Sequence, residues 1–306
     1  MKDYSALKEI TVHTQKELDD IPVDFKGVIY IDASCICVNK LYKMCIAKGR
    51  SSICAFNDAV ITAEDHSCIE ANDNTRIIAK DHSDIIANDN ARVIAKDFSH
   101  VNATGHSDIL ASDFSLIKSF DHVTVYANDF SIVSAGHESK ITAYGNSYVV
   151  AYHFAKLSMW DSSRAVVMSD DVTVESGNHS KVRIRTEFKD VNEYADFYDI
   201  KRKENGKLIL YKAASKDKNG NYTSEWKYNI DKKYPLDRKV YSLQEAIAYH
   251  RFIYDGTPVV LECEVNDKES KLDVYGKNYI MAKKLEDIRI IREVPENEWA
   301  DIITGK

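Results

Sequence analysis

The chain has 306 residues, of which 41 are basic and 48 acidic, with a formal net charge of −7 and 44% hydrophobic residues. This composition is typical of a folded protein of roughly one to three domains and excludes disordered and collagenous chains. No apolar run approaches the roughly 18 residues of a membrane span, and the first residues lack the apolar stretch of a signal peptide. We therefore expect a cytoplasmic protein without membrane contact.

The acidic residues are concentrated in the middle of the chain. Residues 51–180 carry 18 acidic and 8 basic side chains, a net charge of −10, whereas residues 1–50 and 181–306 are close to neutral. Proteins that bind DNA or RNA place Lys and Arg against the phosphates. We therefore expect no direct nucleic-acid binding by the middle region.

Residues 1–28 precede the repetitive part of the chain and are predicted to form an N-terminal cap. A solenoid exposes unpaired strand edges at its ends, so each end needs a covering segment. A short helical stretch is expected near Thr14–Asp20.

An eight-residue repeat occupies residues 29–186, and its unit reads I-x-A-x-D-x-S-x. Apolar or small residues at every second position have the period of a β-strand, and Asp, Asn and Gly form turns. Each octad therefore predicts one short strand and one corner. The unbroken series of aliphatic positions is Ile53, Ile61, Ile69, Ile77, Ile85, Val93, Val101, Ile109, Ile117, Val125, Val133, Ile141, Val149 and Leu157.

A second pattern fixes the number of octads in one coil. Octads containing Lys80-Asp81-His82 and Lys96-Asp97-Phe98 alternate with octads containing Asn72-Asp73-Asn74 and Asn88-Asp89-Asn90, so like octads recur every sixteen residues. The chain is therefore predicted to be mainly β, with a two-sided parallel β-solenoid (β-helix) of sixteen-residue coils that rise about 4.8 Å each. About ten coils are expected, with a one-residue slip between about 164 and 176. The narrow interior leaves no room for a ligand, and we expect neither a cofactor nor a metal.

Six cysteines occur without a C-x-x-C pair or a second cluster at zinc-site spacing, and we expect reduced thiols. Cys37 and Cys45 fall at repeat positions that otherwise hold Ile or Val, which indicates core packing.

Residues 187–306 are predicted to form a small α+β domain. Short strand runs and turn residues define most of its elements, and Ser242-Leu243-Gln244-Glu245 is a capping box that opens a helix. The expected elements are a helix at Asp190–Arg202, strands at Leu208–Ala214, Val259–Val265 and Ile288–Val294, a hairpin turn at Asn219-Gly220, and a helix from Leu243 to about Ile253.

The octad array, preceded by Thr14–Asp19 and Phe25–Ile29, resembles octad-repeat β-solenoid proteins of bacterial phages and prophages. Some of these carry a C-terminal domain with elements like Leu210–Ala213, Leu243–His250 and Ile288–Val294. The resemblance covers most of the chain and implies the fold, a phage or mobile-element origin and a bacterial host cytoplasm, but no activity. Pentapeptide-repeat gyrase inhibitors, which are acidic DNA mimics, are similar in outline only, because their period is five residues.

The corner Asp residues predict carboxylate ladders on both edges of the solenoid. Carboxylates about 5 Å apart repel one another and need hydrogen-bond donors or a shared cation. Turn amides together with the Ser two residues later are the favoured donors, because the Gly-Gly-x-Gly framework of calcium-binding β-rolls is absent. One ladder is Asp65, Asp81, Asp97, Asp113, Asp129 and Asp161, and the other is Asp73, Asp89 and Asp121.

Two outward ladders are the candidate partner-binding residues. The first, at a corner, is His66, His82, Phe98, Phe114 and Phe130, and the second, on the neighbouring face, is Ile78, Ile94, Leu110 and Tyr126. Apolar stripes of this length on a soluble rod usually mark a docking surface, so we expect a protein partner or a homodimer there. Two alternatives stay open: the C-terminal domain covers the stripe, or the rings only stack. We interpret His66 and His82 as solvated rather than as metal ligands.

The C-terminal candidates are the polar residues on predicted ordered elements: Tyr211, Lys212, His250, Glu262 and Glu264. A strand Tyr followed by a later strand Glu is similar to ADP-ribosyltransferase folds, which would make this domain an enzyme. Lys212 stands where that family has Arg or His, and the Ser-Thr-Ser strand is missing. No G-x-S-x-G, P-loop, G-x-G-x-x-G or H-E-x-x-H motif occurs, and no catalytic residue is predicted.

The leading hypothesis is a non-enzymatic interaction protein of phage or mobile-element type. In this hypothesis a rigid acidic solenoid binds a host or phage protein and inhibits a host defence or nucleic-acid-binding protein by DNA mimicry. The alternatives are an enzyme with its site in the C-terminal domain and a virion structural component, which would form trimers.

Overall fold

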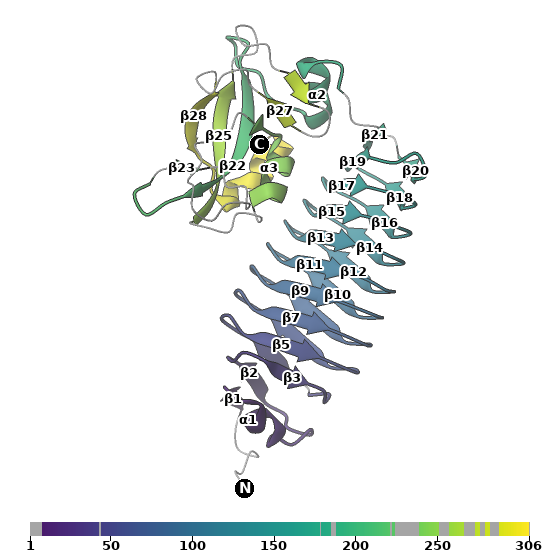
Figure 1. The fold of residues 1–306 in the computed structure, drawn as a ribbon, viewed down its shortest axis with the longest axis vertical. Coiled ribbons are helices and arrows are strands. Elements are labelled where there is room, and N and C mark those ends of the chain that lie inside the picture. The colour runs from purple at the N-terminus through teal and green to yellow at the C-terminus, as the bar shows by residue number, and fades with distance from the viewer. Residues whose placement is uncertain are drawn as a thin grey trace. The chain divides into compact units, whose positions relative to one another are not determined.

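The computed structural model describes residues 8–42, 44–177, 179–184, 188–220, 222–223, 239–250, 257–265, 273–275, 279–281 and 288–305. The chain is mainly β and divides into two compact units, Met1–Ile184 and Arg185–Lys306 (Figure 1).

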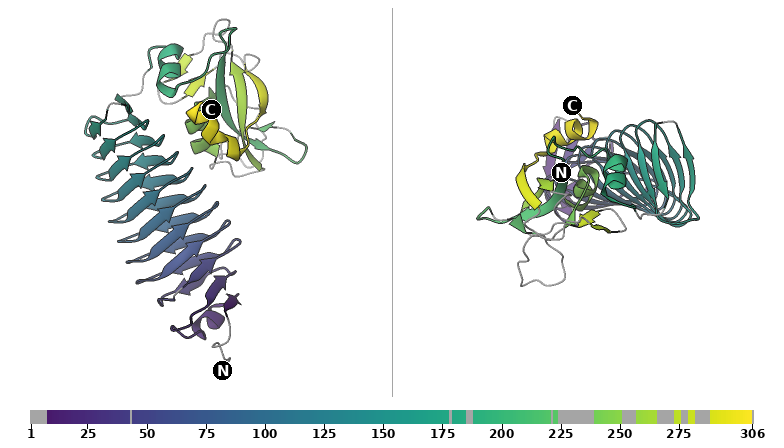
Figure 2. Two further views of the ribbon diagram at one scale, coloured as in Figure 1. Left: turned by 180° about the vertical axis from the view of Figure 1, so that it is seen from behind. Right: turned by 90° about the horizontal axis from the view of Figure 1, so that it is seen from above.

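The first unit is a two-sided parallel β-solenoid, which confirms the predicted fold class (Figure 2). Its strands alternate between two stacked sheets, sheet A with 11 strands and sheet B with 10. Sheet A contains β1 (Glu9–Val12), β2 (Val28–Ile31), β4 (Cys45–Ala47), β6 (Val60–Ala63), β8 (Arg76–Ala79), β10 (Arg92–Ala95), β12 (Asp108–Ala111), β14 (Thr124–Ala127), β16 (Lys140–Ala143), β18 (Lys156–Met159) and β20 (Thr173–Ser176). Sheet B contains β3 (Ile36–Val38), β5 (Ser52–Ala55), β7 (Cys68–Ala71), β9 (Asp84–Ala87), β11 (His100–Ala103), β13 (Leu116–Ser119), β15 (Ile132–Ala135), β17 (Tyr148–Ala151), β19 (Arg164–Val167) and β21 (Lys181–Ile184).

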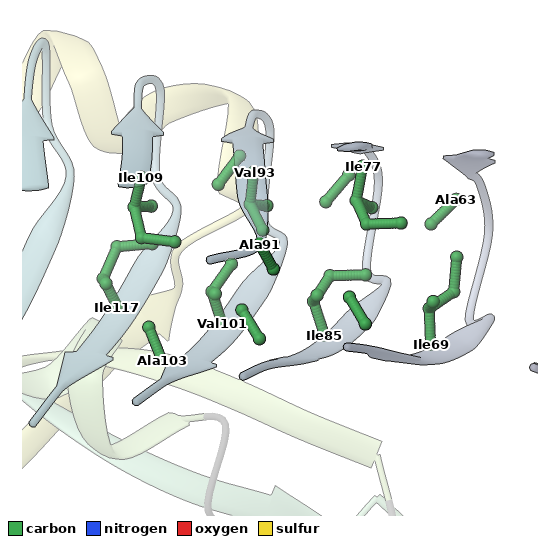
Figure 3. Packing of buried hydrophobic residues seen from close by; sticks show 14 of the residues in the cluster. Ala63, Ile69, Ile77, Ile85, Ala91, Val93, Val101, Ala103, Ile109 and Ile117 are labelled. Carbon is green, nitrogen blue, oxygen red and sulfur yellow. The ribbon is translucent and has the colours of Figure 1, made fainter. Parts of the chain in front are cut away.

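Equivalent residues of successive coils stack in register. Val93 pairs with Ile77 on one side and Ile109 on the other, which is the predicted offset of sixteen residues. The core lies between the two sheets, where Ile109 points toward Ile117 and Val93 toward Val101 (Figure 3). These side chains are at most 1% exposed. The alternation of inward and outward residues therefore fixes which side chains remain available on the surface.

Two single-residue irregularities interrupt the period. The first was predicted: Lys156 pairs with Thr173 instead of with residue 172, because the corner at Met168–Val172 holds one extra residue. The second was missed: Ile36 pairs with Ile53, seventeen residues later. As a result Ile36 takes the inward position and Cys37 is exposed, so the prediction of a buried Cys37 was wrong.

The N-terminal segment is built around α1 (Gln15–Asp19), which matches the expected helical stretch. Thr14 caps it reciprocally: its hydroxyl accepts a hydrogen bond from the Glu17 amide at 3.3 Å, and the Glu17 carboxylate accepts one from the Thr14 amide at 3.2 Å. Leu18 is buried in the core at the end of the solenoid. The segment also supplies β1, which pairs in parallel with β2 and adds a strand that the sequence did not predict.

The second unit contains a four-stranded antiparallel sheet in the order β23-β22-β25-β28 and a three-stranded sheet in the order β24-β27-β26. Helix α3 packs against β22 and β25, and α4 contacts α3. The elements are α2 (Val191–Tyr198), β22 (Leu208–Lys216), β23 (Tyr222–Thr223), β24 (Lys239–Val240), α3 (Leu243–His250), β25 (Thr257–Val265), β26 (Asp273–Tyr275), β27 (Tyr279–Met281), β28 (Ile288–Glu293), the 3-10 helix η2 (Glu296–Glu298) and α4 (Trp299–Thr304).

The expected elements of this unit form, with different limits. Helix α2 ends at Tyr198 rather than at Arg202, because Asp199 takes the left-handed conformation, with φ of 52°, and stops the helix. The predicted hairpin is present: Lys216 pairs with Tyr222 and Gly220 has φ of 81°. These positions follow the turn chemistry that the sequence predicts.

The capping box of α3 is only half formed. The Glu245 amide donates to the Ser242 hydroxyl at 3.3 Å, as expected. The Ser242 amide, however, donates to the Tyr194 hydroxyl at 2.9 Å, and the Glu245 carboxylate accepts from the Tyr198 hydroxyl at 3.4 Å. Tertiary contacts with α2 therefore replace the second arm of the box. The expected end of this helix at Ile253 lies outside the described residues.

Candidate interaction surface

Sheet A presents two columns of outward side chains, one from each outward position of its strands. In β10, for example, Val93 and Ala95 point inward and Arg92 and Ile94 point outward. We call the second outward position of β8, β10, β12 and β14 the apolar column, which consists of Ile78, Ile94, Leu110 and Tyr126. We call the first outward position of the strands from β6 to β18, together with Met44 directly before β4, the mixed column: Met44, Val60, Arg76, Arg92, Asp108, Thr124, Lys140 and Lys156.

The apolar column is a continuous exposed stripe. Pairing across β8, β10, β12 and β14 places its four side chains in register on successive coils. Ile94 is 38% exposed, Leu110 44% and Tyr126 49%, and Ile78 is half-buried. The sequence prediction of an outward apolar ladder on this face is therefore matched by the placement of all four residues.

The mixed column carries charge beside this stripe. Arg92 and Asp108 lie on neighbouring strands and form an ion pair of 3.7 Å, with side chains that are 65% and 54% exposed. An exposed pair of this kind stabilises the fold by only about 0–1 kcal/mol. Both groups therefore retain most of their capacity to interact with an outside molecule.

The corner ladder of His66, His82, Phe98, Phe114 and Phe130 forms a continuous stack, which we call the aromatic ladder. Its ring centroids are 5.4, 5.2, 5.7 and 5.0 Å apart from the first ring to the last. The interplanar angles are at most 18°, and every ring except His66 is half-buried. Each ring covers its neighbour, so stacking along the coils accounts for part of the role of this ladder.

Beneath the rings, the Asp ladder is held by backbone amides of the neighbouring coil. Asp81 accepts a hydrogen bond from the Asp65 amide at 3.1 Å, and Asp97 accepts one from the Asp81 amide at 3.2 Å. These corner residues are left-handed, with φ between 51° and 57°. Asp tolerates this conformation because its short side chain forms local hydrogen bonds. The predicted amide donors are therefore present, although they come from the preceding coil.

The prediction that the following Ser donates to each Asp was wrong. Ser83 and Ser99 are fully buried, and their hydroxyls have no hydrogen-bond partner in the structure. They occupy inward positions in phase with Ile and Ala, so they point into the solenoid and away from the corner carboxylates. Among the described residues, no group of three or more His, Cys, Asp or Glu side chains is arranged to hold a metal.

A second set of rings, on the opposite edge, was not predicted. His106 and His122 stack with centroids 5.1 Å apart, and the His122 Nδ1 lies 3.5 Å from a Glu138 carboxylate oxygen. The His137 Nδ1 lies 3.3 Å from an Asp121 carboxylate oxygen. The sixteen-residue spacing of His106 and His122 was the sequence signal that could have revealed this edge.

Most of the C-terminal candidate residues contact structural partners instead of one another. The Lys212 Nζ donates to the Lys239 carbonyl at 2.8 Å, and the His250 ring packs edge-on against Trp299 with centroids 5.5 Å apart. Lys212 and His250 are both buried.

The two Glu candidates are held by basic side chains. Glu262 pairs with Arg292 at 3.2 Å. Glu264 accepts hydrogen bonds from the ammonium groups of Lys203 at 2.7 Å and Lys207 at 2.6 Å. These hydrogen bonds lower the pKa of Glu264 to about 2.

Tyr211 is the one C-terminal candidate that lines a described pocket, together with Tyr198, Leu243, Gln244 and Ile302. Burial raises the pKa of the Tyr211 hydroxyl well above its usual range. Tyr211 lies directly across from Glu262 on the neighbouring strand, so the sequence-predicted Tyr and Glu are brought together. Lys212 faces the opposite side of the same strand, because successive residues alternate.

No family model, curated protein or solved structure matches the chain. Within the described part of the chain, no helix combines the length and the apolar character needed to span a bilayer.

Proposed function

We propose that this chain is a non-enzymatic interaction protein of phage or mobile-element type, and that a host or phage protein binds the outward face of sheet A. The observation that carries the proposal is the exposed apolar column of Ile78, Ile94, Leu110 and Tyr126. A location in a bacterial cytoplasm belongs to the same proposal.

The repeat itself does not require apolar residues at this position. The same outward position holds Thr62 in β6, Thr142 in β16 and Ser158 in β18, and those strands pair in the same register. Exposed apolar side chains gain free energy only when another surface covers them. The apolar stretch on the central coils is therefore better explained by binding than by folding.

The solenoid also presents this column in a preorganised form. Parallel pairing on both sides of β10 and β12 fixes the backbone beneath Ile94 and Leu110. A rigid surface loses little conformational entropy on binding, so a given contact area yields more affinity than it would on a mobile loop.

DNA mimicry is a weaker explanation of the acidic character. Residues 51–180 carry a net charge of −10 over about eight coils. This is about one charge per 4 Å of solenoid axis, whereas duplex DNA carries one per about 1.7 Å. The negative field therefore supports attraction of a partner with a basic rim, while the apolar column supplies the specific contact.

The enzymatic alternative has less support among the described residues. Lys212, Glu262 and Glu264 are engaged by the Lys239 carbonyl, by Arg292 and by two lysines respectively. General acid–base catalysis needs a group within hydrogen-bond reach of a substrate proton. Tyr211 alone among these candidates borders a pocket, so we do not place the function there.

The test is affinity capture from a bacterial lysate with the tagged full-length wild type and three variants of it. The column variant carries Ile94→Ser, Leu110→Ser and Tyr126→Ser, and the ladder variant carries Phe98→Ser, Phe114→Ser and Phe130→Ser. The matched control is Ile86→Ser, since Ile86 is 42% exposed on sheet B. Circular dichroism verifies that each variant is folded.

We expect one host protein to bind in stoichiometric amount to the wild type and the control, and to be lost from the column variant. Capture should survive moderate salt, because an apolar contact is not screened. Loss at modest salt with the column variant unaffected would favour charge mimicry instead. Equal capture by the wild type and all three variants would overturn the proposal.

A further inference from the structure

We propose that two copies of this chain bind face to face through sheet A, antiparallel, about a twofold axis that runs along the strands between β10 and β12. This inference rests on the proposed function in one respect: it uses the same apolar column and names a second copy as an occupant. The order of residues in the two columns supports this arrangement.

Twofold symmetry allows two ways to stack this face on itself. If the axis runs along the coil-stacking direction, the mixed column of one copy opposes the apolar column of the other, and Arg92 meets Ile94. If the axis runs along the strands, each column opposes itself in reversed order. At the centre of the face, burying an arginine against an aliphatic side chain is unfavourable, so the second arrangement, which leaves such contacts only near the ends of the face, is preferred.

In the second arrangement the apolar side chains meet one another. With the axis between β10 and β12, Ile94 of one copy opposes Leu110 of the other. One strand further out, Ile78 opposes Tyr126, so the half-buried residue meets the most exposed one. Thr62 opposes Thr142 at the borders of the stripe, where the contact becomes polar.

The mixed column is complementary to itself under the same axis. Arg92 of one copy opposes Asp108 of the other, and this occurs twice because of the symmetry. Together with the ion pair of 3.7 Å within each copy, the four groups alternate in sign.

The remaining positions avoid like charges. Arg76 on β8 opposes Thr124 on β14, and Lys140 on β16 opposes Val60 on β6. Lys156 on β18 opposes Met44, which directly precedes β4 and is 50% exposed, so the lysine stem can lie on its apolar side chain. No like-charged pair arises at any of these described mixed-column positions from β4 to β18.

The size of the face sets the strength of the contact. Each strand spans about 13 Å and the eight strands from β4 to β18 span about 38 Å. The face therefore covers roughly 500 Å² per copy, or about 1,000 Å² in total, below a standard stable interface of about 1,600 Å². We accordingly expect a reversible dimer with a micromolar dissociation constant rather than an obligate one.

The test is sedimentation equilibrium of the full chain with charge-swapped variants. Arg92→Asp places like charges opposite Asp108, and Asp108→Arg places like charges opposite Arg92. Each variant alone should dimerise about a hundredfold more weakly than the wild type. Mixing the two should restore the dimer as a heterodimer, and so should combining both changes in one chain. Arg76→Asp is the matched control, because it alters net charge equally but opposes Thr124, and it should change the dissociation constant by no more than about threefold.

Restored association in the mixture is specific to the antiparallel arrangement, because only then do positions 92 and 108 face each other. A monomeric wild type at high micromolar concentration, or single variants that dimerise as the wild type does, would overturn the inference. The capture experiment gives a separate result. If the chain is a monomer that still captures a host protein through the apolar column, the dimer is refuted and the proposed function stands. If the chain dimerises but capture does not depend on the apolar column, the proposed function is refuted and the dimer stands.

Discussion

In the solenoid each strand pairs with the strand of the next coil, sixteen residues away in most coils, whereas in the C-terminal unit Leu208 of β22 pairs with Val265 of β25. The solenoid therefore repeats one environment many times. Its inward residues form the core, and its outward residues form the surface. In the C-terminal unit single residues pack the core and form polar contacts together, as Lys212 and Glu264 do. In the solenoid the surface can therefore vary without disturbing the fold.

A carboxylate introduced at an inward position should have a far larger effect than one introduced at the neighbouring outward position. Ile109 is 1% exposed and Leu110 is 44% exposed, although they are neighbours on β12. Ile109→Asp buries an unpaired carboxylate and should lower the free energy of unfolding by about 4 kcal/mol or more. Leu110→Asp should change it by about 0.5 kcal/mol or less. Urea unfolding followed by circular dichroism measures both changes in the free energy of unfolding. Similar changes at the two positions would contradict the separate roles of inward and outward residues.

In the C-terminal unit, the corresponding change removes a side chain that both packs in the core and forms a hydrogen bond. Trp299 is 1% exposed, packs against the His250 ring and donates from Nε1 to the Val294 carbonyl at 3.3 Å. Trp299→Ala should therefore destabilise this unit by about 3–5 kcal/mol. Hydrogen exchange of the β22 and β25 amides measures the loss. Trp299→Phe keeps most of the ring volume and should recover more than half of it, so an equal loss would show that packing is not the cause.

A smaller effect is expected at the corners, where one side chain serves both the fold and the surface. Asp97 has φ of 52° and accepts the Asp81 amide. Asp97→Ala removes the acceptor and places a Cβ residue without local hydrogen bonds in the left-handed region, which should cost about 1–2 kcal/mol. Asp97→Gly loses the acceptor but not the conformation and should cost less, since Gly105 and Gly145 occupy equivalent corners. If Gly were the worse substitution in urea unfolding, the left-handed conformation would not be the main term.

The smallest effect is a pH dependence in the C-terminal unit. The two lysines hold the pKa of Glu264 at about 2, against an ordinary value of 4.5. A depressed carboxyl pKa adds stability that is fully present above pH 4.5 and is lost as the pH falls from 4.5 toward 2. Glu264→Gln should flatten the stability curve in this range, as followed by acid unfolding. An unchanged acid limb would show that other carboxyls determine it.

The sequence predicted the solenoid well because its signal is repeated. Period-two spacing identifies Val93 and Ile109 as inward and Ile94 and Leu110 as outward, and the sixteen-residue alternation fixes the coil. The same reasoning failed at Cys37, where one added residue before Ile53 reverses the inward and outward positions. A single irregular coil carries no repeated signal that would reveal such a shift.

In the C-terminal unit, local sequence patterns predicted only some of the elements. Strands β22 and β25 were predicted, over the shorter ranges Leu208–Ala214 and Val259–Val265, because apolar residues predominate at those positions. Strands β24, β26 and β27 were not, because two or three residues carry no measurable period. Nor did the candidate residues reveal their partners: that Glu264 is held by Lys203 and Lys207 depends on strand pairing over more than fifty residues.

For the interaction surface, the sequence located the columns but did not show their charge complementarity. Arg92 of one copy faces Asp108 of the other only when two mixed columns are placed face to face in opposite directions. The same holds for the aromatic ladder, whose half-buried rings in the structure reveal mutual covering that spacing alone does not show.

The central claim, that another protein surface covers the apolar column, is tested most directly by site-specific photocrosslinking in living bacterial cells. A benzophenone amino acid replaces Leu110 in one form of the chain and Ile86 in the other; the two are 44% and 42% exposed on opposite sheets. We expect discrete crosslinked products, with a host protein or a second copy, from position 110 and none from position 86. Products from both positions in equal yield, or from neither, would contradict it.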